Sequence, residues 1–141
     1  MIENNFIDSY LYEEIEESLK SIATKNNVKV LNVDDVKSNV PDTTWPSCKA
    51  IMMNINFYTK VSYHFRLAHE LSHLLYGDMS LQDVYQFSEF GKRGEELIAH
   101  KNAIKMLMEI KRPTNVQSFM EVYKIPSWLS EYVEAEYSLQ V

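Results

Sequence analysis

The stretch HFRLAHELSHLLYGD, residues 64–78, governs how this chain is interpreted. Its apolar residues recur three and four positions apart, which predicts an amphipathic helix over Val61–Leu75. Gly77 follows at a position where helices commonly end. Inside the expected helix stand His69 and His73. Residues four apart lie on one face of a helix, one turn from each other, so both imidazoles can reach a single point.

The residues of this motif are those that a metal-dependent hydrolase needs. Neutral imidazole is a good ligand for Zn²⁺, and a catalytic zinc takes three protein ligands and leaves one position open. Glu70 is rotated about 100° from His69 on an ideal helix, so we expect it beside the ion rather than bound to it. His69 and His73 are therefore the candidate metal ligands, and Glu70 is the candidate general base for a water molecule.

The third ligand has to come from another part of the chain. Helical spacing predicts a helix over Glu95–Ile110, which offers Glu95, Glu96 and His100 as donors. We select Glu96, because a carboxylate with two histidines is a ligand set of hydrolytic zinc sites. His100 then stands one turn away, beside a ligand or facing the substrate, and a site of three histidines that uses His100 is the alternative. Glu95 is interpreted as a solvated carboxylate at the helix start.

Two other residues near the motif are weaker candidates. Tyr76 lies one turn beyond His73 and could point its hydroxyl at the site, although an aromatic residue at that spacing more often packs in a core. His64 lies off the face of the two histidines, and we interpret it as a surface or packed histidine. A motif this short also arises by chance, so a helix that carries it without a metal is a further alternative.

The rest of the chain predicts an α+β fold that is mostly helical and has a small β-sheet. An acidic amphipathic helix is expected over Ile7–Ile22, and β-branched residues predict a short strand over Val28–Val33. A loop over Asp34–Ser47 is rich in turn residues, and a second strand is expected over Ala50–Phe57. Residues 78–94 have a weak pattern and are interpreted as a surface excursion.

The C-terminal residues are expected to complete one domain. Apolar residues predict short helices over Val116–Tyr123 and Trp128–Tyr137, and we expect the segment 110–141 to pack on the preceding part. A chain of 141 residues with 45% hydrophobic content can build one core. Residues 1–141 are therefore predicted to form a single domain.

Composition limits the partners and the compartment. The chain has 14 Lys and Arg against 20 Asp and Glu, a formal charge of −6, which argues against direct binding of nucleic acid. The single cysteine, Cys48, fits a reducing compartment. The first residues lack the features of a signal peptide, and no apolar run approaches the length of a membrane span. We therefore expect a cytoplasmic protein that does not contact a membrane.

Two blocks of residues resemble those of a known family. Phe65–Leu75 is similar to the F-x-L-A-H-E-L-G-H-L-L block of the ImmA/IrrE metallopeptidases. Residues 96–108 resemble their E-x-E-A-N-x-F-A-x-x-L-L-M-P block, and the alignment places Glu96 on the first glutamate, the family's third zinc ligand. Residues 119–129 also resemble the C-terminal segment of phage and mobile-element members. The chain departs from the family pattern at Ser72, Ile98, His100, Asn102 and Glu109.

The resemblance implies a zincin-like fold, in which the H-E-x-x-H helix carries the active site, and an activity. It implies a cytoplasmic zinc endopeptidase of gluzincin type, with Glu70 as the base and Zn²⁺ held by His69, His73 and Glu96. The implied substrate is a helix-turn-helix repressor of a prophage or mobile element, which is inactivated by cleavage. The alternative is a protein-binding module, such as an antirepressor or a toxin–antitoxin component, that keeps the fold without catalysis.

Overall fold

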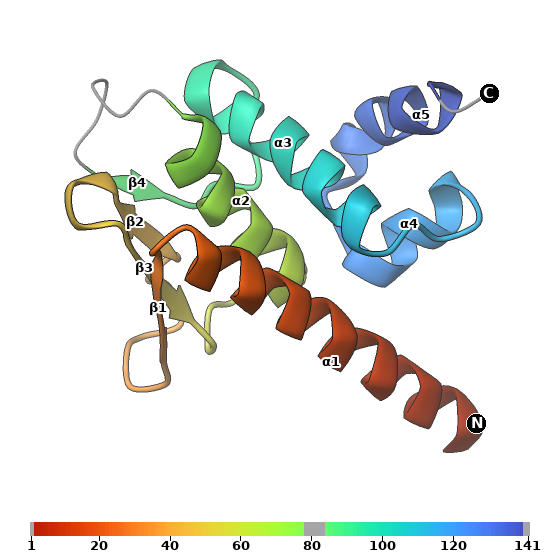
Figure 1. The fold of residues 1–141 in the computed structure, drawn as a ribbon, viewed down its shortest axis with the longest axis horizontal. Coiled ribbons are helices and arrows are strands. Elements are labelled where there is room, and N and C mark those ends of the chain that lie inside the picture. Colours follow the sequence, from red (N-terminus) through yellow and green to blue (C-terminus); the bar gives the residue numbers. More distant parts are fainter. Residues whose placement is uncertain (1, 78–83, 140–141) are drawn as a thin grey trace.

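The computed structural model describes residues 2–77 and 84–139, which form an α+β fold as the sequence predicts. Figure 1 shows a small sheet on one side of the molecule and helices on the other. The helices are α1 (Ile2–Lys25), α2 (Tyr63–Tyr76), α3 (Gly94–Ile110), α4 (Val116–Tyr123) and α5 (Ser130–Ser138), with single 3-10 turns at Pro46–Cys48 and Ser127–Leu129. The strands are β1 (Lys29–Val33), β2 (Thr43–Trp45), β3 (Ala50–Asn54) and β4 (Tyr85–Gln86).

The sheet is mixed, and its strand order is β1-β3-β2-β4. β1 runs parallel to β3, whereas β2 is antiparallel to both β3 and β4. The prediction of a loop over residues 34–47 is wrong at β2, and that of a surface excursion over 78–94 is wrong at β4. Strands of three and two residues are too short to show an alternating pattern. Residues 78–83 of the predicted excursion lie outside the described residues.

Helix α2 lies between the sheet and α3 (Figure 1), and it contacts α1, α3, β2 and β3. It begins after Ser62, whose side-chain oxygen accepts a hydrogen bond from the Phe65 backbone N–H, so one unpaired N–H of the first turn is satisfied. Every residue from Phe65 to Leu74 is buried. A helix buried on all sides is the centre of a fold, and its polar side chains need partners inside the protein.

One hydrophobic cluster joins the two ends of the described chain. Leu19 of α1, Phe65 of α2 and Leu107 of α3 belong to it, and so do Phe119 of α4 and Val133 of α5. The residues that follow α3 therefore pack on the earlier elements. None of the described helices combines the length and the apolar composition needed to cross a membrane.

Candidate metal centre

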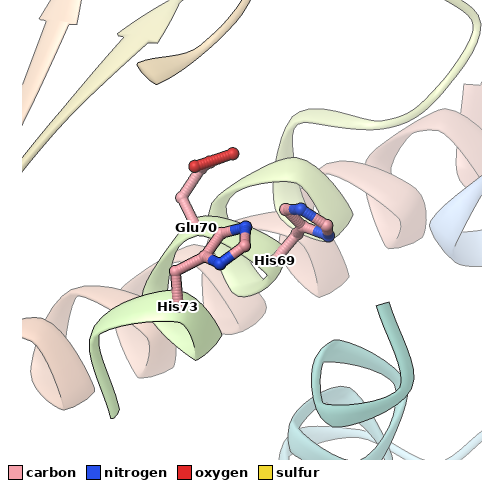
Figure 2. A group of neighbouring side chains, drawn as sticks. All are labelled: His69, Glu70 and His73. Atoms are coloured by element: carbon pink, nitrogen blue, oxygen red, sulfur yellow. The ribbon is translucent and has the colours of Figure 1, made fainter. Parts of the chain in front are cut away.

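The histidines and the glutamate of the motif form a buried group on α2. His69, Glu70 and His73 are each at most 1% exposed, and one ligand atom from each lies within 4.8 Å of the others. Figure 2 shows the two imidazole rings on neighbouring turns of α2, while Glu70 leaves the helix toward the strands. The group could therefore hold a metal ion.

Glu96, from the first turn of α3, meets both imidazoles at one oxygen. Its Oε2 lies 2.8 Å from His69 Nε2 and 3.0 Å from His73 Nε2. Burial acts to raise the pKa of Glu96, but the close approach of the His69 and His73 rings outweighs it and lowers this pKa to about 2, so the carboxylate is ionised. The structure thus brings all three residues that the sequence singled out as ligands to one point.

The residues around His69 determine which of its nitrogens carries a proton. His100 Nε2 lies 2.9 Å from the Ser88 carbonyl oxygen, and a carbonyl only accepts, so this nitrogen carries hydrogen. Burial lowers the pKa of His100 to about 3, so its ring is neutral and its Nδ1 is an acceptor. His69 Nδ1 lies 3.0 Å from His100 Nδ1, so His69 Nδ1 carries the hydrogen and donates it to His100. His69 Nε2 then presents a lone pair toward Glu96.

This donor set fits a metal ion. A neutral His69 turns a lone pair toward an ionised carboxylate, and these two electron-rich atoms, 2.8 Å apart, repel each other unless a positive charge lies between them. A proton or a metal cation can provide that charge. Two imidazole nitrogens and one carboxylate oxygen are a ligand set of hydrolytic zinc sites. Both nitrogens of His100 are engaged elsewhere, so the structure does not support the alternative with three histidine ligands.

Glu95 has a different environment from the one predicted. Its side chain is 14% exposed, and Oε2 lies 3.6 Å from His73 Nδ1. The prediction of a solvated carboxylate is wrong, because the first turn of α3 faces the end of α2, where Gly77 leaves room. A Cβ atom at Gly77 would lie 2.8 Å from Glu95 Oε2. The 3.6 Å separation is longer than a hydrogen bond, so the contact between Glu95 and His73 is electrostatic.

Glu70 is held from the sheet. The Thr44 hydroxyl on β2 donates a hydrogen bond to Glu70 Oε2, and Glu70 Oε1 has no hydrogen-bond partner in the part of the chain that the structure describes. Burial raises the pKa of Glu70 well above 4.5, against the effect of the Thr44 hydrogen bond. A metal cation beside this carboxylate would favour its ionised form.

A groove leads from the surface to the third candidate ligand. It has a volume of about 690 Å³, and Tyr85 and Gln86 of β4, together with Arg93 and Glu96, are among its lining residues. The Glu96 side chain is 24% exposed. The groove therefore reaches Glu96, whereas His69, Glu70 and His73 are buried and are not among its lining residues.

Two candidates from the sequence lie elsewhere. Tyr76 is 60% exposed and lines a different groove, of about 560 Å³, with residues of α1 and α3 such as Ile22 and Met106. The structure does not bring it to the imidazoles. His64 stacks on Tyr12, with ring centroids 5.5 Å apart, which agrees with its interpretation as a packed histidine.

Thr44 and Ser88 are site residues that the sequence analysis missed. Thr44 lies in a segment predicted as a loop, and Ser88 contributes only a backbone carbonyl. Neither carries a recognisable spacing relative to the H-E-x-x-H motif.

Comparisons of the chain with protein-family models, with curated proteins and with solved structures found no match.

Proposed function

We propose that this protein is a zinc-dependent endopeptidase of the ImmA/IrrE type, with α2 as a zincin-like active-site helix. The observation that carries the proposal is the convergence of His69 Nε2 and His73 Nε2 on Glu96 Oε2. The hydrogen bonds from His69 to His100 and from His100 to the Ser88 carbonyl fix the tautomer of His69, so that a lone pair on its Nε2 points toward the same place. Glu70 lies beside these donors without occupying their meeting point, which suits a base better than a ligand.

Each residue has a defined part in the proposed reaction. His69, His73 and Glu96 hold the ion. When bound, zinc polarises a peptide carbonyl and makes a water molecule more acidic. Glu70 accepts a proton from the attacking water at Oε1, the oxygen that Thr44 leaves free, and delivers it to the nitrogen of the departing amine. In this proposal a peptide segment approaches along the groove beside β4, which Glu96 lines.

The substrate we propose is a helix-turn-helix repressor of a prophage or mobile element, cleaved in the cytoplasm. This part rests on the resemblance of residues 65–75 and 96–108 to the two family blocks. The net charge of −6 agrees with a protein that acts on a DNA-binding partner without contacting DNA itself. A small helix-turn-helix repressor encoded beside this gene would be the natural candidate.

Substitution of the base tests the proposal directly. Purified protein loaded with zinc is mixed with that neighbouring repressor, and the products are followed by mass spectrometry. We expect Glu70→Gln to retain equimolar zinc and to lose cleavage, because the amide cannot accept the proton. Glu109→Gln, the same change at an exposed site on α3, serves as the control and should cleave normally.

The same variants separate catalysis from the binding-module alternative. A binding module would relieve repression in cells even when Glu70→Gln and His73→Ala are combined, because capture of a partner needs neither the base nor the ion. An endopeptidase would lose that relief completely. Cleavage by Glu70→Gln at the wild-type rate would overturn the proposed mechanism.

A further inference from the structure

We propose that Thr44 is a positioning residue for Glu70, and that β2 acts as a clamp that sets the direction of this carboxylate. The inference rests on the proposed function, because it treats Glu70 as the base. Thr44 is 0% exposed, and its hydroxyl donates to Glu70 Oε2. No role follows for this residue from the H-E-x-x-H motif, since 26 positions separate it from Glu70.

The clamp is possible because the distance between two residues on the strand matches the distance between their two partners on the helix. Asp42, the residue before β2, and Thr44 on β2 are two positions apart, and their partners Arg66 and Glu70 are four positions apart on α2. Two residues of a strand span about 6.6 Å and four residues of a helix about 6.0 Å. The two pairs can therefore form together, and they fix how β2 runs along α2.

The Asp42 end of the clamp does not depend on Thr44. Asp42 Oδ2 lies 2.9 Å from Arg66 Nη1, and Asp42 Oδ1 accepts the Asn54 backbone N–H at 2.8 Å. All of these groups are buried, so water competes little with them. Loss of the Thr44 hydroxyl should therefore leave β2 in place and remove only the contact to Glu70.

The contact to Thr44 decides which oxygen of Glu70 is available. The threonine hydroxyl has one proton to donate, and it is directed at Oε2. Oε1 has no hydrogen-bond partner among the described residues although it is buried. A buried carboxylate with one oxygen tethered and one free is set to receive a proton at a single atom. Without the hydroxyl, the carboxylate can turn about its last torsion, which has only broad preferences.

A hydroxamate probe reports this orientation without a known substrate. Acetohydroxamate binds zinc through two oxygens and donates a hydrogen bond to a carboxylate beside the metal. Its dissociation constant with zinc-loaded protein is measured by calorimetry, together with zinc content and thermal midpoint. We expect Thr44→Val, which keeps the shape and removes the hydroxyl, to weaken binding about tenfold or more. Thr44→Ser keeps the hydroxyl and should stay within about threefold of wild type.

Thr43→Val is the matched control. Thr43 is also buried on β2, but its hydroxyl donates to the Pro41 carbonyl oxygen at 3.0 Å rather than to α2. We expect this variant to bind the probe like wild type. In a double-mutant cycle, Thr44→Val should have no further effect once Glu70→Ala has removed the carboxylate.

The outcomes separate this inference from the proposed function. If wild type binds acetohydroxamate and Glu70→Ala weakens it, but Thr44→Val does not, the positioning role is wrong and the proposed function stands. If zinc-loaded wild type does not bind the probe, the ion has no open position, and the proposed function fails together with the inference. A Thr44→Val protein that loses zinc, or melts far below Thr43→Val, would show that Thr44 is only a structural residue.

Discussion

His69 and His100 face each other with their Nδ1 atoms 3.0 Å apart, and only one of these atoms can carry the hydrogen between them. The Ser88 carbonyl oxygen, 2.9 Å from His100 Nε2, decides the matter by requiring a hydrogen on that nitrogen. His69 is therefore protonated at Nδ1 and presents Nε2 to the candidate metal position. A backbone carbonyl two residues beyond β4 thus controls the tautomer of a residue on α2 through an intervening ring.

Replacement of His100 should weaken zinc binding without abolishing it. His100→Leu leaves His69 Nδ1–H without an acceptor, and loss of such a partner typically lowers metal affinity about 10-fold to 100-fold. His100→Asn can accept from His69 and donate to Ser88, so it should retain more affinity. Competition with a chromophoric chelator measures both dissociation constants. Equal zinc affinity for His100→Leu and wild type would contradict the assigned hydrogen-bond chain.

Gly91 should be needed for the position of Glu96. A Cβ atom at Gly91 would lie 2.5 Å from Glu96 Cβ, so Gly91→Ala must displace the carboxylate or the loop. We expect its zinc dissociation constant to rise at least about tenfold, or about 1.4 kcal/mol, because the displaced carboxylate no longer meets both imidazoles. Metal titration followed by calorimetry gives the value.

Gly94→Ala is the control for this prediction. A Cβ atom at Gly94 would meet nothing within 4 Å, but its backbone has φ of +56°. Alanine there should cost about 1 kcal/mol of folding free energy through the left-handed backbone and should leave zinc affinity unchanged. If both variants bind zinc equally well, close packing of Gly91 on Glu96 is not important.

Removal of Arg66 should destabilise the fold strongly. Its guanidinium lies 2.9 Å from Asp42 Oδ2, and both side chains are at most 5% exposed. Arg66→Met leaves a buried carboxylate without its cation, which typically costs about 3 to 5 kcal/mol in free energy of unfolding. Asp42→Asn combined with Arg66→Met should recover part of this loss, because no charge remains buried. Urea unfolding of wild type, Arg66→Met and the double variant measures these differences. If Arg66→Met were as stable as wild type, the ion pair of Arg66 and Asp42 would not stabilise the fold.

Stability should fall at high pH through Tyr63. Burial is the main cause that raises the pKa of Tyr63 from 10.0 to about 12, and its hydroxyl donates to Asn32 Oδ1 at 2.5 Å. The unfolded chain ionises near pH 10.0 and the folded chain near 12, so the contribution of Tyr63 is complete below pH 10.0 and is lost as the pH rises toward 12. Tyr63→Phe should therefore lose less free energy of unfolding over this interval than wild type. Urea unfolding at pH 9 and 11 compares the two, and parallel losses would contradict the shifted pKa.

Local periodicity was sufficient for the elements that run over several turns. The helical spacing around His69 and His73 predicts α2 to within two residues at its start, and it also predicts that the two imidazoles share a face. Glu96 followed from the ligand types that suit zinc and from the family resemblance, and the structure places its carboxylate between the two rings. The fold class followed in the same way, because helices and longer strands have periods that a sequence displays.

Only the tertiary structure decided what surrounds these residues. The contacts of Thr44 with Glu70 and of Glu95 with His73 join positions more than 20 residues apart. They depend on how β2 and α3 pack against α2. β2 and β4 are too short for an alternation of apolar and polar residues to predict them from the sequence. A helical repeat is a property of neighbouring residues, whereas the tautomer of His69 and the free oxygen of Glu70 depend on groups that only packing brings within hydrogen-bond distance.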